Sequence, residues 1–441
     1  MWLQRLKRRL GASGVILLGM LVVVEAQAAD PTLGEVLRLV QQQQAQIDEL
    51  RSQLLSQEQR LQEAAVRLQE TSQLAQQSQA NQQQIGETRA MLEATVESFA
   101  AADIGAQPAV RIGGYGELHY NNNDAGAEMD MHRFVLFFGH QFSDELSFVS
   151  ELELEHSIAG DGQVGEIELE QAYVQWDYRP SQRLRMGMFL LPVGSLNETH
   201  EPNTFYGVER NNIERTIIPT TWWEAGLAFS GELAPSWGYD LAVHSGLNLN
   251  TGSAASPTSA SRRTSLRSGR QKVGLANADS LAYTGRLSYS GMAGLQVSAA
   301  MQHQTDITQG DDEQYGIGPI SANLLAADLN YQRGQLGFRA LYATWLIDDE
   351  ISRLNAGAER QTGWYVEPSY RLLPDLGVFA RYGTYDLTAG QASTSNQQRQ
   401  VDIGLNYWLH DNVVLKVDLQ RQDNDRGAEL DGFNVGLGYN F

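Results

Sequence analysis

The sequence lacks cysteine and is poor in lysine. Its 441 residues contain no cysteine, which excludes disulfide bonds, thiolate nucleophiles and cysteine-ligated metals. Lysine occurs only at Lys7, Lys272 and Lys416, and the formal net charge is −21. A chain this acidic has no broad basic surface for nucleic acid, so we predict no nucleic-acid partner.

Long apolar runs and catalytic motifs are also missing. Beyond residue 28 no run of about 18 apolar residues occurs, so no transmembrane helix is expected there. The chain has no HExxH and no GxSxG pattern, and we predict no catalytic residue, metal site or cofactor. Four of the eight histidines, His119, His132, His140 and His156, fall early in the strand-rich region. They could meet inside the fold, but positions at the membrane interface or in simple packing are favoured.

Residues 1–28 have the layout of a secretory signal peptide. A positive segment (Arg5, Lys7, Arg8, Arg9) precedes the apolar run Val15–Val24, and Ala26-Gln27-Ala28 offers a cleavage site. The alternative is a membrane anchor, for which the apolar run is short. Cleavage would leave 28 basic and 52 acidic side chains, a net charge of −24.

A heptad pattern covers residues 33–99. The first heptad position reads Leu33, Val40, Ile47, Leu54, Leu61, Leu68 and Ala75. Such a repeat predicts an α-helical coiled coil that associates with copies of itself. A single solvated helix or a disordered Gln-rich linker is the alternative. Residues 100–109 are rich in small residues and breakers, and are interpreted as a linker.

Residues 110–441 are predicted to form an all-β transmembrane barrel of about 16 antiparallel strands. Sixteen alternating runs extend from Arg111–Asn121 to Gly432–Phe441, and short and long connections alternate between them. This alternation is typical of barrels in the cell outer membrane. An even strand number places both barrel ends on the periplasmic side, so the N-terminal arm is expected in the periplasm.

The alternation also predicts which charged side chains face the lumen. The candidates are Arg133, Arg185, Arg286, Arg339, Arg381, Lys416, Glu151, Glu153 and Glu155. Opposed rows of charge can select ions. The alternative, favoured for any single residue, is that these arginines and glutamates pair and stiffen the wall.

Two of the long connections carry unusual charge. The third, Pro192–Thr221, is long enough to fold inward and narrow a pore. Its candidate constriction residues are Glu198, Glu201, Glu209, Arg210, Glu214 and Arg215. The fourth, Asn248–Asp279, is basic through Arg262, Arg263, Arg267, Arg270 and Lys272. It could draw anions to the mouth or contact lipopolysaccharide phosphates, or it is a flexible solvated loop.

Several motifs resemble one porin family. They are EQAYV at Glu170–Val174, GMFLLPVG at Gly187–Gly194 and the pair Glu214-Arg215, with RIGGYGELHY at Arg111–Tyr120 and the terminal Phe441. They resemble the phosphate-selective porin O and P family. The resemblance implies a trimeric sixteen-stranded channel with an inward third loop. The lysine cluster of that family has no counterpart here, so small organic anions are an equal candidate to phosphate.

The sequence therefore predicts an outer-membrane porin that is not an enzyme. It is expected to form a homotrimer in contact with outer-membrane lipid and lipopolysaccharide, and to pass small hydrophilic solutes, with a preference for anions. The alternative is a structural tether, in which residues 33–99 grip a periplasmic partner or peptidoglycan and the barrel is mainly an anchor. A barrel enzyme such as a lipid hydrolase is disfavoured, because no Ser/His pairing stands out.

Overall fold

The computed structural model describes Gln44 and residues 110–160, 162–249, 265–310, 318–354, 358–389 and 396–441. The chain divides into two compact units, Met1–Gln79 and Ala80–Phe441. The predicted signal peptide (1–28), coiled coil (33–99) and linker (100–109) lie outside the described residues except for Gln44, and they stay predictions. No described helix has the length and apolar content needed to cross a membrane.

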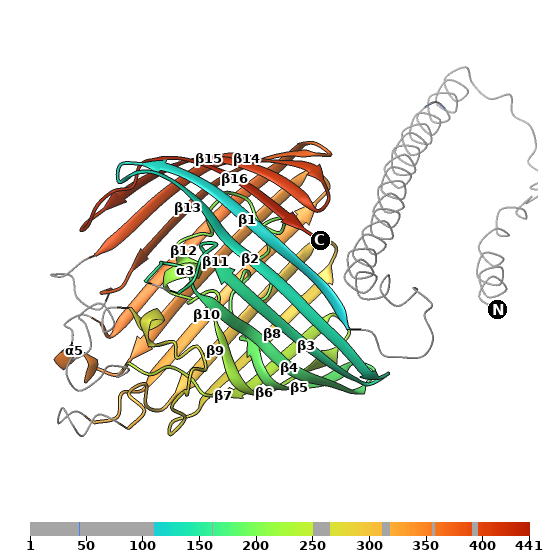
Figure 1. The fold of residues 1–441 in the computed structure, drawn as a ribbon, viewed down its shortest axis with the longest axis vertical. Coiled ribbons are helices and arrows are strands. Elements are labelled where there is room, and N and C mark those ends of the chain that lie inside the picture. Colours follow the sequence, from blue (N-terminus) through green and yellow to red (C-terminus); the bar gives the residue numbers. More distant parts are fainter. Residues whose placement is uncertain are drawn as a thin grey trace, which may run out of the picture. The chain divides into compact units, whose positions relative to one another are not determined.

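The second unit is a closed barrel of sixteen antiparallel strands, which confirms the predicted strand number and pairing (Figure 1). Every strand pairs with its neighbours in the chain, and β1 and β16 close the ring. The strands are β1 Arg111–Asn123, β2 Gly126–Ser143, β3 Leu146–Glu155, β4 Ile167–Arg179, β5 Gln182–Leu190, β6 Trp223–Ala234, β7 Trp237–His244, β8 Ala282–Met292, β9 Leu295–Gln304, β10 Ala322–Arg333, β11 Leu336–Ile347, β12 Arg360–Leu373, β13 Leu376–Asp386, β14 Gln397–His410, β15 Val413–Asn424 and β16 Gly432–Asn440. Among the described residues, three short helices lie in the connections: α3 Ile213–Thr216, η1 Leu266–Gly269 and α5 Ile351–Leu354.

The strands form because apolar and polar residues alternate along them. In β15, Leu415, Val417 and Leu419 are 38%, 39% and 64% exposed. The intervening Lys416 and Asp418 are 2% and 3% exposed. The apolar side chains thus form the outer face, where lipid offers polar groups no hydrogen-bond partner. The charged side chains are enclosed by the barrel.

The connections differ at the two ends of the barrel. At one end each hairpin turn has two residues outside the strands, for example Asp144-Glu145 and Asp411-Asn412. At the other end most connections are long, the longest being residues 191–222 and 245–281. The first connection departs from the expected pattern. β1 and β2 pair as far as Asn123 and Gly126, which leaves two residues between them where a longer loop was expected.

Register shifts lie beside six of the short turns, and two β-bulges interrupt the alternation in the middle of strands. Glu117 pairs with Arg133 and Leu118 with Met131, so His132 is an extra residue in β2. Glu151 pairs with Gln171 and Leu152 with Leu169, so Glu170 is extra in β4. At a bulge, the extra side chain can point to the face of the sheet opposite the one that strict alternation predicts. His132 stacks on buried His119, and Glu170 is 1% exposed, so both bulges add a side chain to the lumen.

The ring closes through the last residue. Phe441 N donates to Gly114 O, Gly114 N donates to Phe441 O, both at 2.9 Å, and the Phe441 ring stacks on Phe134 at 5.8 Å. Deletion of Phe441 removes this bonded pair and uncovers the β1–β16 seam. We expect the deletion to lower the yield of folded barrel in the outer membrane, measured by heat-modifiable gel migration. Substitution of Phe441 by Tyr keeps the backbone bonds and the ring, and should restore the yield; an unchanged yield in the deletion contradicts the prediction.

Candidate pore constriction

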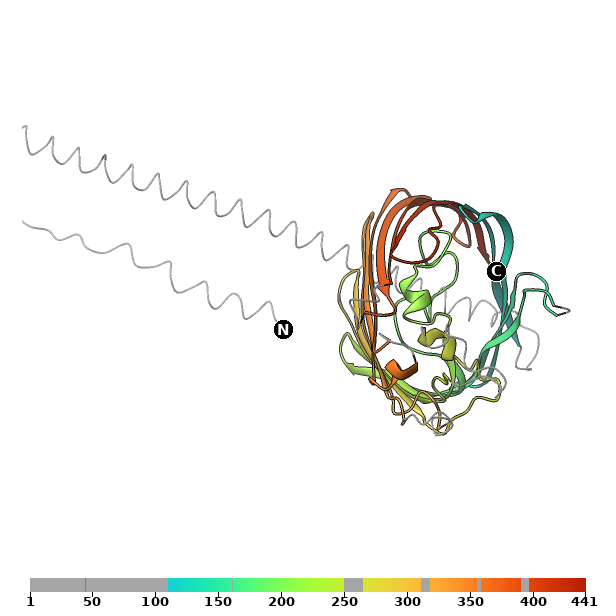
Figure 2. The ribbon, with the colours of Figure 1, turned by 90° about the vertical axis from the view of Figure 1, so that its left-hand side faces the viewer.

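The connection between β5 and β6, residues 191–222 (loop L3), lies inside the barrel. Figure 2 shows α3, green, within the ring of strands, together with η1, yellow. Ile213, Ile217 and Trp222 of L3 are at most 1% exposed. Trp222 packs on Trp345 of β11 with ring centroids 6.2 Å apart, and Trp345 Nε1 donates to Ile217 O at 2.8 Å. An apolar core inside the barrel therefore holds one side of L3 against the wall.

Glu214, the second residue of α3, fixes the shape of L3. Its buried carboxylate accepts the amides of Ser195 and Leu196 at 2.5 and 2.7 Å, Asn211 Nδ2 at 2.9 Å and Tyr365 Oη at 3.0 Å. Gly194 allows this approach, since its φ is +76° and a Cβ there would lie 2.7 Å from Glu214 Oε1. Glu214 was predicted as a constriction residue. Its hydrogen bonds give it a structural place in the loop instead of an open position in the pore.

The tip of L3 reaches the far wall. Val208 N donates to Asp418 Oδ2 at 2.6 Å, and Asn406 Nδ2 donates to Phe205 O at 3.0 Å. Lys416 is buried, with Nζ 3.6 Å from the centre of the Phe205 ring. L3 thus crosses the lumen and is bonded to strands β14 and β15 on the other side.

The predicted arginine row is in place along the wall, and its members have protein partners. Arg381 binds Asp402 at 2.9 Å and Glu367 at 3.3 Å, and Arg339 donates to Thr204 O at 2.6 Å. Arg286 contacts Asp240 at 2.8 Å and also Glu198, which Arg185 approaches at 3.8 Å. Burial favours a higher pKa for the Glu198 carboxyl, but the nearby Arg286 and Arg185 outweigh it, so this pKa is lowered from its ordinary value. These pairs fasten L3 and the wall together, as the alternative interpretation of the row expected.

The acidic candidates on β3 are also enclosed by the barrel or line its lumen. Glu151 and Glu153 are each 1% exposed, and Glu155 lines the larger cavity described below. Arg133 lies between Glu117 at 3.1 Å and Glu153 at 3.8 Å. Glu201 is half-buried in L3, where its backbone carbonyl accepts Thr204 Oγ1 at 2.7 Å.

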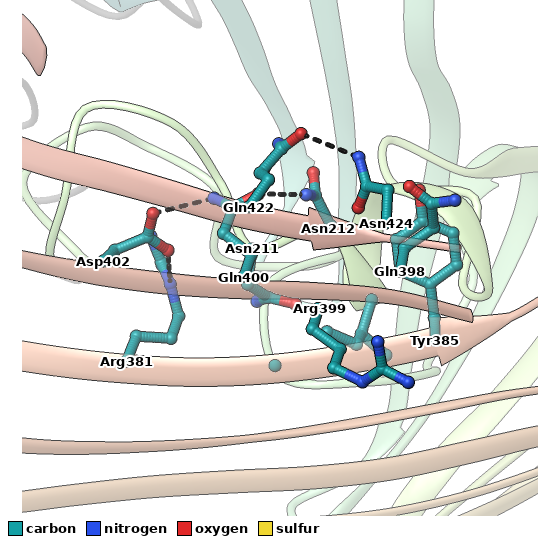
Figure 3. A pocket seen from close by; sticks show the side chains of 12 residues that line it. Asn211, Asn212, Arg381, Tyr385, Gln398, Arg399, Gln400, Asp402, Gln422 and Asn424 are labelled. Atoms are coloured by element: carbon teal, nitrogen blue, oxygen red, sulfur yellow. Dashed lines mark hydrogen bonds and ion pairs between the residues drawn. The ribbon is translucent and has the colours of Figure 1, made fainter. Parts of the chain in front are cut away.

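The space behind α3 is closed by amide side chains. A cavity of about 40 Å³ lies between L3 and β13–β15 (Figure 3). Gln400 bridges it, donating to Asp402 at 2.7 Å while its carbonyl accepts Asn212 at 2.5 Å and Gln422 at 2.9 Å. This volume holds about one or two water molecules, so this cavity is too small for a hydrated solute.

A larger cavity, of about 380 Å³, lies on the other side of L3 and is called the passage below. It is bounded by β1–β4, L3 and the segment around η1. Its acidic wall includes Glu117, Glu155, Glu166, Glu168 and Glu209, and its basic wall includes Arg210, Arg215, Arg267, Arg270 and Lys272. Acidic and basic side chains therefore line the same polar cavity.

Most of the acidic wall is paired. His119 lies 3.1 Å from both Glu117 and Glu209, and Lys272 forms ion pairs with Glu166 and Glu168. Burial raises the pKa of Glu209, but His119 lowers it well below its usual range. The field of these carboxylates is thus largely neutralised within the wall.

The four arginines of the basic wall have few carboxylate partners among the described residues. Arg210 Nη1 donates to Thr221 Oγ1 at 3.1 Å, Arg270 donates to backbone carbonyls of L3, and Arg215 is 3.9 Å from Glu209. Burial, with Arg270 and Arg215 nearby, lowers the pKa of Arg267 to about 10. We call Arg210, Arg215, Arg267 and Arg270 the arginine cluster. It presents positive charge to the passage.

Arg267 and Arg270 belong to the basic loop that could draw anions to the mouth, contact lipopolysaccharide phosphates or be a flexible solvated loop. The structure instead places them in the lumen cavity, because η1 folds inward and Asn248 N donates to Gly269 O at 2.8 Å. Arg262 and Arg263 lie outside the described residues. A basic loop in a chain with an acidic lumen wall is a sequence signal that the two could meet. The alternation of strands does not continue into loops, so it does not predict where loop side chains point.

Three histidines come together in the lumen, contrary to the favoured packing interpretation. His119 stacks on His132 at 4.5 Å, and His132 meets His156 at 5.9 Å. Asp130 Oδ2 lies 3.3 Å from His132 Nδ1 and 2.8 Å from His156 Nδ1. His140 contacts Phe142 instead. The bulge at His132, which no sequence pattern marks, is the reason that this side chain joins the others.

A closed barrel with an apolar outer face and a polar lumen narrowed by an inward loop defines a diffusion channel of the outer membrane. The chain belongs to the Gram-negative porin family, whose model matches residues 90–427. It is an outer-membrane porin for passive diffusion and not an enzyme.

Individual proteins are similar to this chain in sequence or in fold. An uncharacterized protein of Aquifex aeolicus (strain VF5) is 32% identical over 362 residues, which cover 75% of this chain and 80% of that protein. The solved OmpF of Salmonella typhi, in complex with daunomycin, has a TM-score of 0.55 at 14% identity, covering 76% of this chain and 98% of that one. An anion-selective porin from Comamonas acidovorans has a TM-score of 0.52 at 12% identity, covering 76% and 100%. At these identities the solved structures are similar to this chain in fold alone.

Proposed function

We propose that this porin prefers anions and that the arginine cluster sets the preference. The observation that carries the proposal is the imbalance across the passage. Four carboxylates of the acidic wall, Glu117, Glu209, Glu166 and Glu168, are paired with His119 or Lys272. By contrast, Arg267 Nε and Arg210 Nε are buried without a hydrogen-bond partner among the described residues. Unpaired guanidinium groups beside a solute path attract anions and repel cations. A solved porin of similar fold is described as anion-selective, which agrees with the proposal.

The direct test is the reversal potential of purified protein in planar bilayers under a KCl gradient. We expect a potential of the sign set by chloride. A potential set by potassium overturns the anion preference but leaves the channel function intact. A preparation that is folded, judged by heat-modifiable migration, yet does not conduct would support the tether alternative instead.

The proposed solutes are small inorganic and organic anions. The motif resemblance implies specificity for phosphate, but neither lysine of the barrel region supports it. Lys272 is held by Glu166 and Glu168, and Lys416 is buried against Phe205. Guanidinium groups bind carboxylates and phosphates alike in a forked geometry. Block of chloride current by added phosphate and by added succinate, compared at equal concentration, distinguishes the two classes.

We further propose a homotrimer whose subunits associate partly through residues 33–99, with the arm in the periplasm. The heptad pattern of that segment supports this proposal. Deletion of residues 33–99 should raise the fraction of monomer after mild cross-linking, while the barrel still conducts. Trimers that persist at the full level would show that association belongs to the barrel alone. Loss of conduction would show that the arm is needed for the channel.

A further inference from the structure

We propose that Glu151 of β3, Glu170 of β4 and His200 of L3 form a binding site for a divalent transition-metal ion that fastens L3 to the barrel wall. The three side chains are at most 3% exposed and come from three separate segments. Glu170 also lines the cavity that contains the arginine cluster, but no arginine of that cluster belongs to the ligand set, and the proposal does not depend on the anion preference.

The distances fit one shared ion better than direct hydrogen bonds. His200 Nε2 lies 3.6 Å from both Glu151 Oε1 and Glu170 Oε2, which is beyond hydrogen-bond range. None of these three atoms has a hydrogen-bond partner among the described residues, although all are buried. Two ligands that are each about 2.1 Å from zinc lie roughly 3.4 to 3.6 Å apart for angles at or slightly above tetrahedral. The ligand atoms of the three side chains all lie within 4.8 Å of one another, so the orphan atoms are grouped closely enough to share one ion.

The imidazole is already oriented as a metal ligand. His200 Nδ1 donates to Asn197 O at 3.1 Å, so in the neutral ring the lone pair of Nε2 faces the two carboxylates. Asn197 is itself fixed, because Nδ2 donates to Leu191 O and Trp222 O at 2.8 Å and Oδ1 accepts Trp222 N at 2.7 Å. On the other side, Gln171 Nε2 donates to Glu151 Oε2 at 2.6 Å. Outer hydrogen bonds of this kind orient the ligands of known metal sites.

Charge balance favours a divalent ion. No lysine or arginine among the described residues forms an ion pair with Glu151 or Glu170; Arg133 binds Glu117 and Glu153. Arg133 and Arg270 line the same cavity as Glu170 but form no ion pair with it, so the two buried carboxylates face His200 without a direct cationic partner. A divalent ion with neutral His200 compensates both.

The ligand types indicate the class of metal. One imidazole with two carboxylates suits zinc and its first-row neighbours, whereas calcium and magnesium prefer oxygen alone. The bulge at Glu170 supplies the third ligand, since strict alternation from Gln171 would turn Glu170 outward. The ion would join L3 to both β3 and β4. It would thereby fix the first turn of the loop that bounds the passage.

The test uses the full-length protein in detergent, stripped with EDTA and titrated with zinc chloride by calorimetry and by elemental analysis after desalting. Two other groups could hold zinc, His119–His132–Glu209 and Asp130–His132–His156, and both contain His132. His132→Gln is therefore the matched control. We expect wild type and His132→Gln each to retain one high-affinity zinc ion per chain.

Substitution of a ligand should abolish this binding. Removal of outer partners alone costs metal sites about 10- to 100-fold, so Glu170→Gln and His200→Gln should each weaken binding by more than about 100-fold. Loss of the ion in His132→Gln, its retention in His200→Gln, or no high-affinity binding in wild type overturns the proposal. The last result would assign the place to a protonated His200.

A measurement on unmodified protein covers the case in which a variant does not fold. X-ray absorption of zinc bound to wild type should show a single imidazole and oxygen ligands at about 2.0–2.2 Å. Two imidazoles would place the ion at the His132 groups and overturn the assignment to His200.

Discussion

The double substitution Arg215→Gln/Arg267→Gln should shift the selectivity of the channel from chloride toward potassium. Neither side chain supports L3. Arg215 is 55% exposed and its contact with Glu209 is long, at 3.9 Å, and Arg267 Nε has no hydrogen-bond partner among the described residues. A unit charge about 4 Å from an ion changes its energy by about 1 kcal/mol even in water, a factor of about five in local concentration. We therefore expect the chloride-to-potassium permeability ratio to fall several-fold in a reversal-potential measurement.

The matched control for this experiment is Arg399→Gln. Arg399 is a barrel arginine paired with Asp423 and Asp425 at 3.4 and 3.3 Å, and it borders the small cavity behind α3. Its substitution should leave the permeability ratio at the wild-type value. A double variant that behaves like this control would remove the arginine cluster from the selectivity mechanism. Screening predicts that the difference between the variants shrinks as salt is raised toward 1 M.

Glu214→Gln should loosen L3 and change the channel itself. The added NH₂ group faces either the two amides of Ser195 and Leu196 or the Asn211 and Tyr365 donors, so two hydrogen bonds to a carboxylate oxygen are lost. Bonds to a charged group contribute about 1.5–3 kcal/mol each, and buried donors without partners add a cost. We expect larger and noisier single-channel conductance, and cleavage within residues 191–222 under limited proteolysis.

Glu145→Gln serves as the control for this variant. Glu145 is exposed in the two-residue turn between β2 and β3, where its side chain bonds nothing in L3. Its conductance and cleavage pattern should match wild type. If Glu214→Gln also matches wild type in both measurements, the apolar packing of Trp222 on Trp345 suffices to hold the loop, and the role assigned to Glu214 is wrong.

Much of the barrel could be predicted from sequence because its physics is local. Lipid on one side and water on the other impose a period of two residues, which Leu415 and Lys416 display directly. The sixteen strands and their order follow from that period and from the turns. The lumen could not be read in the same way. Whether Arg381 is free or paired depends on Asp402 and Glu367, which lie on neighbouring strands and are brought beside it only by the register.

The interior of the barrel depends on contacts between segments far apart in the chain. L3 reaches β15 through Val208 and Asp418, which are 210 residues apart in sequence. Arg267 enters the passage because η1 folds back onto residues 248 and 249, a turn that no periodicity announces. The pairing of Glu117 with His119 and Arg133 then decides which charges remain unpaired. The inward-facing charges of one strand can be predicted from that strand alone. The net electric field in the lumen depends on the charges of all strands and inward loops together.

The bulges in β2 and β4 have a consequence for how such channels diversify. Each adds one residue to a membrane-spanning strand while the hydrogen-bonded pairs on both sides stay matched. The gain of a single codon in the middle of a strand is thus compatible with closure of the ring, provided that the surplus side chain enters water. In this chain the two surplus residues are a histidine and a glutamate. Insertion in wall strands, and not only in surface loops, is therefore a route by which a diffusion channel can acquire new chemistry.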